Sequence, residues 1–247
     1  MPGVLATLEE RRILTFGVAM DPGSFTRTSR IAGRSPWVVP AFGIHPWRAA
    51  DHAADLAALD PFIARAPMLG EVGLDFHWVD DTATYPAQRQ VFDYFVAAAR
   101  REGKILNVHT KGAEREILAA LDPDVARRTI IHWYSGPPDL LDGFFDLGAS
   151  FTVGVEVLHS DPIRRIARAI PLELLLVETD SPGGEQFLDG TRGTPAAITR
   201  VIDHLAALRD TTPHDLATAI RANILRLMGD DPRLQRWRDL LDGNADP

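Results

Sequence analysis

Seven short apolar segments alternate with amphipathic segments along this chain, and this alternation limits the folds that it can adopt. The apolar segments have the length of strands and cover residues 13–20, 37–44, 68–71, 104–109, 129–132, 149–157 and 174–178. Helical patterns cover 1–12, 24–32, 51–65, 85–102, 113–121, 138–147, 161–169, 195–208, 213–228 and 233–241. Strands that alternate with helices at this spacing form parallel βαβ units, so the chain predicts a barrel or a doubly wound sheet.

Polar residues at the ends of four predicted strands favour the barrel. Glu71, His109, His132 and Asp180 each come directly after an apolar stretch. In a parallel barrel the carboxyl ends of all strands converge on one mouth, where barrel enzymes keep their active sites. An open sheet would spread the same residues along a crevice. We therefore predict an α/β protein with a TIM-barrel-like fold, in a single domain that covers residues 1–247.

Composition sets limits on the function. The sequence contains no cysteine, which excludes disulfides and thiolate metal sites and fits the reducing cytoplasm, where we expect the protein. The net charge of −8 argues against a broad basic face for duplex nucleic acid, but it allows a small cleft that binds phosphate. No apolar run approaches the length of a membrane span, so we expect no membrane association.

The four strand-end residues also predict a metal site. Two histidines, one glutamate and one aspartate provide nitrogen and oxygen ligands that suit Zn, Mn, Fe or Mg. One histidine at a strand end is more often structural than functional. Their recurrence at the ends of four strands favours a shared metal site over four unrelated structural residues.

The motifs around these residues resemble the TatD family of metal-dependent hydrolases. The matching stretches are 70–75 (GEVGLD), 109–111 (HTK), 131–136 (IHWYSG), 177–182 (VETDSP), 43–46 (GIHP) and 223–227 (NILRL). The resemblance covers essentially the whole chain. It implies an amidohydrolase-type (β/α)8 barrel that binds divalent ions (Mg, Mn or Zn), usually two, and hydrolyses DNA. We infer no obligate protein partner from the sequence.

The resemblance also implies roles for the ligands. Glu71 would bridge two metal ions, His109 and His132 would hold one of them, and Asp180 would help to hold the other. Glu71 and Asp180 would be the catalytic pair, with Asp180 as acceptor of a proton from water. Glu178 is a candidate support behind the site.

Four further residues are candidate substrate contacts. Lys111 stands where the family usually has arginine, and it keeps the charge but loses the bidentate fork. Arg192 lies in a loop that resembles a family loop after the last strand. His45 either contacts substrate or is an ordinary strand-end histidine. Trp133 either stacks on a base or packs above the barrel.

The start of the chain departs from the family pattern. The family begins with a strand that carries His-x-His and completes the shell of the second metal, whereas the first histidine here is His45. We therefore expect a barrel that is N-terminally incomplete and lacks its first strand. A start site assigned too late explains this, and a genuine loss is the alternative. Either way, Glu71, His109 and His132 would retain one ion.

Three functions remain open from the sequence. The motifs favour a deoxyribonuclease that acts on single strands or ends of DNA. The acidic composition favours a barrel hydrolase of a small amide, ester or lactone. The missing His-x-His favours a catalytically impaired relative that binds a ligand or a partner.

Overall fold

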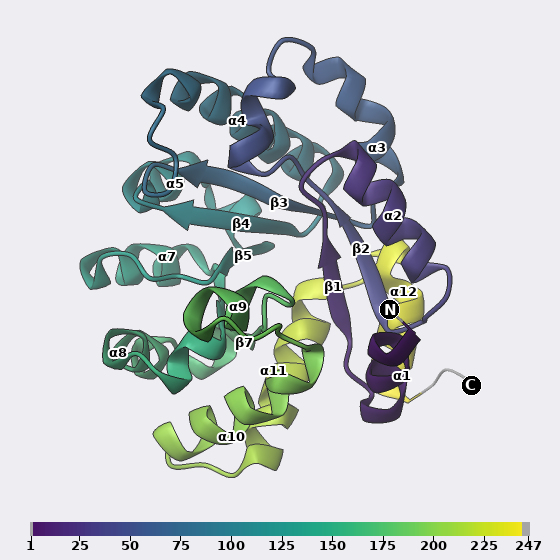
Figure 1. Ribbon diagram of the computed structural model, residues 1–247, viewed down its shortest axis with the longest axis vertical. Coiled ribbons are helices and arrows are strands. Elements are labelled where there is room, and N and C mark those ends of the chain that lie inside the picture. The colour runs from purple at the N-terminus through teal and green to yellow at the C-terminus, as the bar shows by residue number, and fades with distance from the viewer. Residues whose placement is uncertain (1, 244–247) are drawn as a thin grey trace.

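The computed structural model describes residues 2–243 and is built around one curled parallel β-sheet that helices surround (Figure 1). Within that range the strands are β1 (Thr15–Val18), β2 (Val38–Phe42), β3 (Met68–Asp75), β4 (Leu106–Lys111), β5 (Thr129–His132), β6 (Ser150–Val153) and β7 (Leu175–Val177). All neighbours are parallel, and the order in the sheet follows the order in the chain. The predicted seven-stranded α/β fold of barrel type is confirmed.

Helices follow the strands and pack around the sheet. They are α1 (Pro2–Arg11), α2 (Pro22–Ala32), α3 (Asp60–Arg65), α4 (Tyr85–Glu102), α5 (Glu114–Ala120), α6 (Pro123–Ala126), α7 (Leu141–Leu147), α8 (Asp161–Ala169), α9 (Gly183–Asp189), α10 (Ile198–Leu208), α11 (Pro213–Met228) and α12 (Gln235–Asp242). Among residues 2–243, no helix combines the length and the apolar character needed to cross a bilayer.

The predicted continuous helix over 51–65 is wrong. The chain there forms two 3-10 turns, Pro46–Asp51 and Leu56–Leu59, before the short helix α3. Asp55 starts a new turn, because its carboxylate accepts the backbone N–H of Ala58 at 3.3 Å. Pro61 has no N–H to donate, so a helix cannot run through it from upstream. The predicted strand over 149–157 is also too long, because β6 ends at Val153 and a 3-10 turn follows.

The prediction that the third strand ends at Glu71 is wrong as well, since β3 continues to Asp75. The glycines that suggested a strand end instead allow β3 and β4 to approach closely. Gly73 has φ +147°, and a Cβ atom there would lie 2.0 Å from the carbonyl oxygen of His109. The register of β3 against β4 shifts between Leu69 and Val72, so Glu71 lies at an irregularity inside the strand.

Apolar packing fixes the strands that carry the site. Every residue of β2, β3 and β5 is buried, whereas the four residues of β1 are only half-buried. Behind β2, the ring of Phe42 packs against Phe25 of α2 and Phe95 of α4, with centroids 5.2 and 5.7 Å apart. Such aromatic pairs stabilise the contact between sheet and helices beyond their buried area. The middle of the sheet is therefore a firm base for polar side chains.

Candidate metal centre

Three adjacent strands deliver the central side chains of the site. Glu71 comes from β3, His109 from β4, and His132 is the last residue of β5. His109 and His132 are register partners in the parallel pair β4–β5, so they point to the same side of the sheet. Their ring centroids lie 6.2 Å apart. The strand pairing alone therefore brings these two predicted ligands side by side.

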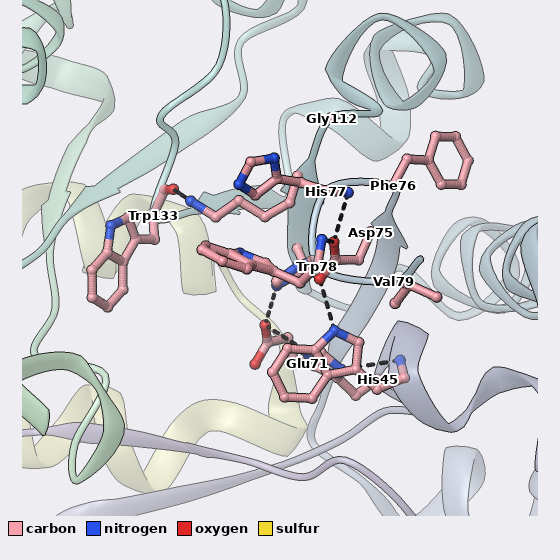
Figure 2. Close-up of polar contacts among 12 residues, drawn as sticks. His45, Glu71, Asp75, Phe76, His77, Trp78, Val79, Gly112 and Trp133 are labelled. Carbon is pink, nitrogen blue, oxygen red and sulfur yellow. Dashed lines mark hydrogen bonds and ion pairs between the residues drawn. The ribbon is translucent and has the colours of Figure 1, made fainter. Parts of the chain in front are cut away.

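Three imidazoles surround the carboxylate of Glu71, and Figure 2 shows it beside one of them, His45. Its Oε1 lies 2.9 Å from Nδ1 of His109, 3.5 Å from Nε2 of His45 and 3.6 Å from Nε2 of His132. All four side chains are buried. A buried carboxylate is stable only where positive groups or hydrogen-bond donors compensate it, and these three rings do so.

The charges of this cluster support one another. Burial alone would raise the pKa of Glu71, but the three histidines outweigh it and hold this pKa well below its usual range. Burial likewise favours neutral His132, yet the carboxylates of Glu178 and Glu71 raise its pKa to about 10. The pKa of His109 is also raised, because Asp75 and Glu71 outweigh its burial. At neutral pH, the protonated ring of His132 therefore compensates the carboxylates of Glu71 and Glu178.

The same donors fit a divalent cation. Ligand atoms of His45, Glu71 and His109 all lie within 4.8 Å of one another. Imidazole nitrogen and carboxylate oxygen form the mixed donor set that binds zinc and related transition metals. A cation at this place would replace the imidazole protons as the positive partner of Glu71. The structure thus makes His45 a candidate ligand donor, whereas the sequence suggested either a substrate contact or an ordinary strand-end histidine.

Asp75 supports His109 from the far side and was missed from the sequence. It is fully buried, and its Oδ2 accepts hydrogen bonds from His109 Nε2 at 3.1 Å and Trp47 Nε1 at 2.7 Å. Its Oδ1 accepts the backbone N–H groups of His77 and Trp78. These donors outweigh burial and lower the pKa of Asp75 to about 2. The carboxylate therefore stays ionised and directs Nδ1 of His109 towards Glu71.

Glu178 plays the equivalent part for His132. Its Oε2 lies 2.6 Å from Nδ1 of His132, which leaves Nε2 of that ring facing Glu71. Glu178 lies just beyond β7, so this contact joins β5 to the far end of the sheet. A carboxylate behind each histidine fixes the ring and its tautomer, as is usual for histidines that bind metals.

Asp180 lies beyond the end of β7, close to the same cluster. Its backbone has φ +45°, a left-handed conformation. More than a third of its surface is reachable by solvent, but the surrounding protein withdraws the carboxylate from bulk water. This desolvation raises the pKa of Asp180, and the charges of Glu178 and Glu71 raise it further. The carboxylate of Asp180 is therefore more basic than that of an ordinary aspartate, whereas Glu71 is less basic than an ordinary glutamate.

Lys111 and Trp133 lie together beside the cluster. Lys111 Nζ donates to the backbone oxygen of Trp133 at 3.1 Å and to Ser135 Oγ at 2.6 Å. It also lies 5.8 Å from the centroid of the Trp133 ring. Trp133 itself is only 9% exposed, and its indole N–H donates to Glu156 at 2.5 Å. The structure thus packs Trp133 into the wall and leaves little of its face for a base.

Arg192 is exposed on the loop after α9. The next residue, Gly193, donates its N–H to the backbone oxygen of Pro182 at 3.2 Å, which folds this loop back over the turn that follows Asp180. Arg192 thus lies near that turn, outside the ligand cluster.

The fold and the donor set define the class of a barrel-type hydrolase with a metal centre of histidines and carboxylates. The family model described as TatD related DNase matches residues 3–229, and the chain belongs to this family. It is 30% identical over 247 residues to the metal-dependent hydrolase YcfH of Escherichia coli, covering 95% of this chain and 91% of that protein.

Two further relatives agree with this assignment. The human deoxyribonuclease TATDN3 is 24% identical over 226 residues, which cover 85% of this chain and 81% of that protein. The crystal structure of YjjV, a TatD homologue from Escherichia coli, superposes with a TM-score of 0.76 at 24% identity, covering 85% of this chain and 83% of that one. This last likeness confirms the fold.

Proposed function

We propose that this protein is a divalent-metal-dependent hydrolase that cleaves phosphodiester bonds of DNA, with single strands or strand ends as its substrates. One observation carries the proposal: a buried carboxylate, Glu71, is surrounded by three imidazoles at the carboxyl ends of the strands in a TatD-family chain. The absence of cysteine supports a cytoplasmic location.

Glu71, His109 and His132 would hold the metal, with His45 as a further nitrogen donor beside them. When bound there, a divalent ion would supply Lewis-acid chemistry that lowers the pKa of water and neutralises charge on the phosphate. Asp75 and Glu178 hold the two imidazoles so that one nitrogen of each ring faces Glu71.

Two further side chains act on the substrate directly. Asp180 accepts a proton from the attacking water, because its raised pKa makes it a stronger base than an ordinary aspartate. Lys111 places its ammonium group at the edge of the site, where it binds a phosphate oxygen in exchange for its bond to Ser135. The net charge of −8 disfavours a broad contact with duplex DNA, so we infer that the substrate is bound mainly at the mouth.

The test is hydrolysis of end-labelled DNA by protein loaded with Mg, Mn or Zn, compared with a panel of neutral esters and lactones. We expect cleavage of single-stranded DNA that a chelator abolishes. Glu71→Gln should lower both the metal content and the rate, because it removes the anionic donor at the centre. Glu10→Gln, at an exposed position on α1, is the matched control. Hydrolysis of a lactone or ester, with DNA left intact, would show that the substrate is a small molecule.

A further inference from the structure

Exposed aromatic side chains gather at one place beside the metal centre. Three of the five large apolar side chains exposed within residues 2–243 are Trp47, Trp78 and Phe187, at 55%, 49% and 65%. All three line one cavity of about 520 Å³, a volume within the usual range of small-molecule sites. Trp78 and Phe187 meet edge to face, with centroids 5.4 Å apart. Exposed apolar surface gathered in this way marks a binding surface.

The three aromatic residues come from different parts of the barrel. Trp47 follows β2, Trp78 follows β3, and Phe187 belongs to α9, which follows β7. The cavity is therefore assembled from the segments that follow the neighbouring strands β2 and β3 and from the helix that follows β7, the last strand in the sheet order.

The cavity adjoins the candidate ligands through Trp47. The ring of Trp47 packs edge to face on the ring of His45, with centroids 4.7 Å apart. Its indole N–H donates to Oδ2 of Asp75, and the same oxygen lies 3.1 Å from Nε2 of His109. A molecule seated against Trp47 would therefore lie within one nucleotide's length of the metal centre.

Charge separates this cavity from the phosphate side of the mouth. Asp80 and Asp81 line the cavity and repel phosphate, whereas Lys111 offers an ammonium group on the side of Trp133 and Ser135. The cavity thus selects a ligand that is flat, apolar on its faces and free of negative charge. Nucleobases have this character, and their amino groups can donate to carboxylates.

We propose that this cavity is a nucleobase subsite, in which Trp78 and Phe187 receive one unpaired base of the strand whose phosphate lies at the metal centre. The inference rests on the proposed function and adds the part of the substrate that is recognised. A base can enter the cavity only after it leaves its stack and its partner, which is easiest in single strands and at ends. Selection of such substrates then follows from the aromatic cavity together with the metal centre.

The test compares a labelled single-stranded oligonucleotide with the same strand carrying one abasic residue. Binding is measured by fluorescence anisotropy in chelator, so that it does not depend on hydrolysis, and kcat/KM is measured with Mn. We expect Trp78→Ala and Phe187→Ala to weaken binding of the intact strand by roughly 5- to 100-fold, as expected for loss of one stacked base. The same substitutions should weaken binding of the abasic strand much less. The ratio of the affinity for the intact strand to that for the abasic strand should therefore fall towards one.

Two controls separate stacking from general damage. Leu172→Ala removes an exposed leucine (43%) from the turn that precedes β7, at the opposite end of the strand, and should keep the preference. Phe187→Leu keeps apolar bulk without a ring and should lose most of the preference. If the wild-type protein binds both strands equally, or if the aromatic variants keep the preference, the subsite is refuted. If no DNA is hydrolysed but the preference depends on Trp78 and Phe187, the nuclease function falls and the subsite stands.

Discussion

Replacing Asp75 with asparagine tests whether this carboxylate controls the metal ligand His109. Asparagine has the shape of the protonated acid but keeps only one acceptor oxygen. Its amide nitrogen must face either the N–H groups of His77 and Trp78 or the pair formed by Trp47 and His109. In the second case His109 has to present a lone pair at Nε2 and keep its proton on Nδ1, the nitrogen that faces Glu71.

The magnitude follows from the pKa of Asp75, which the fold lowers from 3.8 to about 2. This lowering means that the folded protein favours the anion over the neutral acid by about 2 kcal/mol. Asp75→Asn should therefore lower the free energy of unfolding of the metal-free protein by about 2–3 kcal/mol at pH 7.5. Since the residue also positions a ligand, metal affinity should fall by about 10- to 100-fold.

Urea unfolding in chelator measures the first effect, and competition with a chromogenic chelator measures the second. The contribution of Asp75 is present above its unfolded pKa of 3.8 and is lost as the pH falls towards 2, so the variant should also lose stability less steeply in acid. Asp146→Asn removes a charge from an exposed position on α7 and is the control. If Asp75→Asn matched this control in both stability and metal affinity, the assigned role of Asp75 would be wrong.

Two further predictions concern protons and phosphate. Metal binding near pH 8 should release protons, because the pKa of His132 is about 10 in the metal-free protein. Titration calorimetry in buffers of different ionisation enthalpy measures the number of protons released per metal ion bound. The stability that this proton gives is complete below pH 6.5 and is lost as the pH rises through 10. Glu178→Gln should reduce both this pH-dependent stability and the number of protons released on metal binding. An unchanged number of released protons in that variant would contradict the role of Glu178. Lys111→Ala should slow DNA hydrolysis and weaken its salt dependence at constant metal content, whereas an equal loss on a neutral ester would contradict a phosphate contact.

Local sequence patterns predicted the sheet well, because apolar runs of strand length directly reflect burial between helices. They failed where a residue serves a distant partner. Glycine is common where strands end, so Gly73 was interpreted as part of a strand end. Its actual role is to allow the main chain of β4 to pack closely, and the residues next to it in the sequence do not reveal this. The helical spacing of Leu56, Leu59 and Phe62 also fits a chain of separate 3-10 and α-helical turns, so periodicity alone misled.

The site shows the same division. Glu71, His109 and His132 were identified because each follows an apolar stretch, and family motifs surround them. Asp75 was missed, since its contacts with Trp47 and His109 join residues 28 and 34 positions apart. Long-range hydrogen bonds of this kind leave no periodic signal. The one local clue was a second carboxylate, Asp75, four residues after Glu71 in an otherwise apolar stretch, because aspartate is seldom fully buried without partners.

The close approach of β3 and β4 at Gly73 has a consequence for the size of the ion. Glu71 and His109 project from strands whose main chains nearly touch at this glycine, so main-chain packing fixes the points from which the two side chains start. Closely spaced starting points favour a small ion, which both side chains reach at a short distance. Oxygen and nitrogen ligands lie at about 2.0–2.2 Å from zinc or magnesium but at about 2.3–2.6 Å from calcium. The site should therefore exclude calcium by size, and a residue without a functional group takes part in ion selectivity.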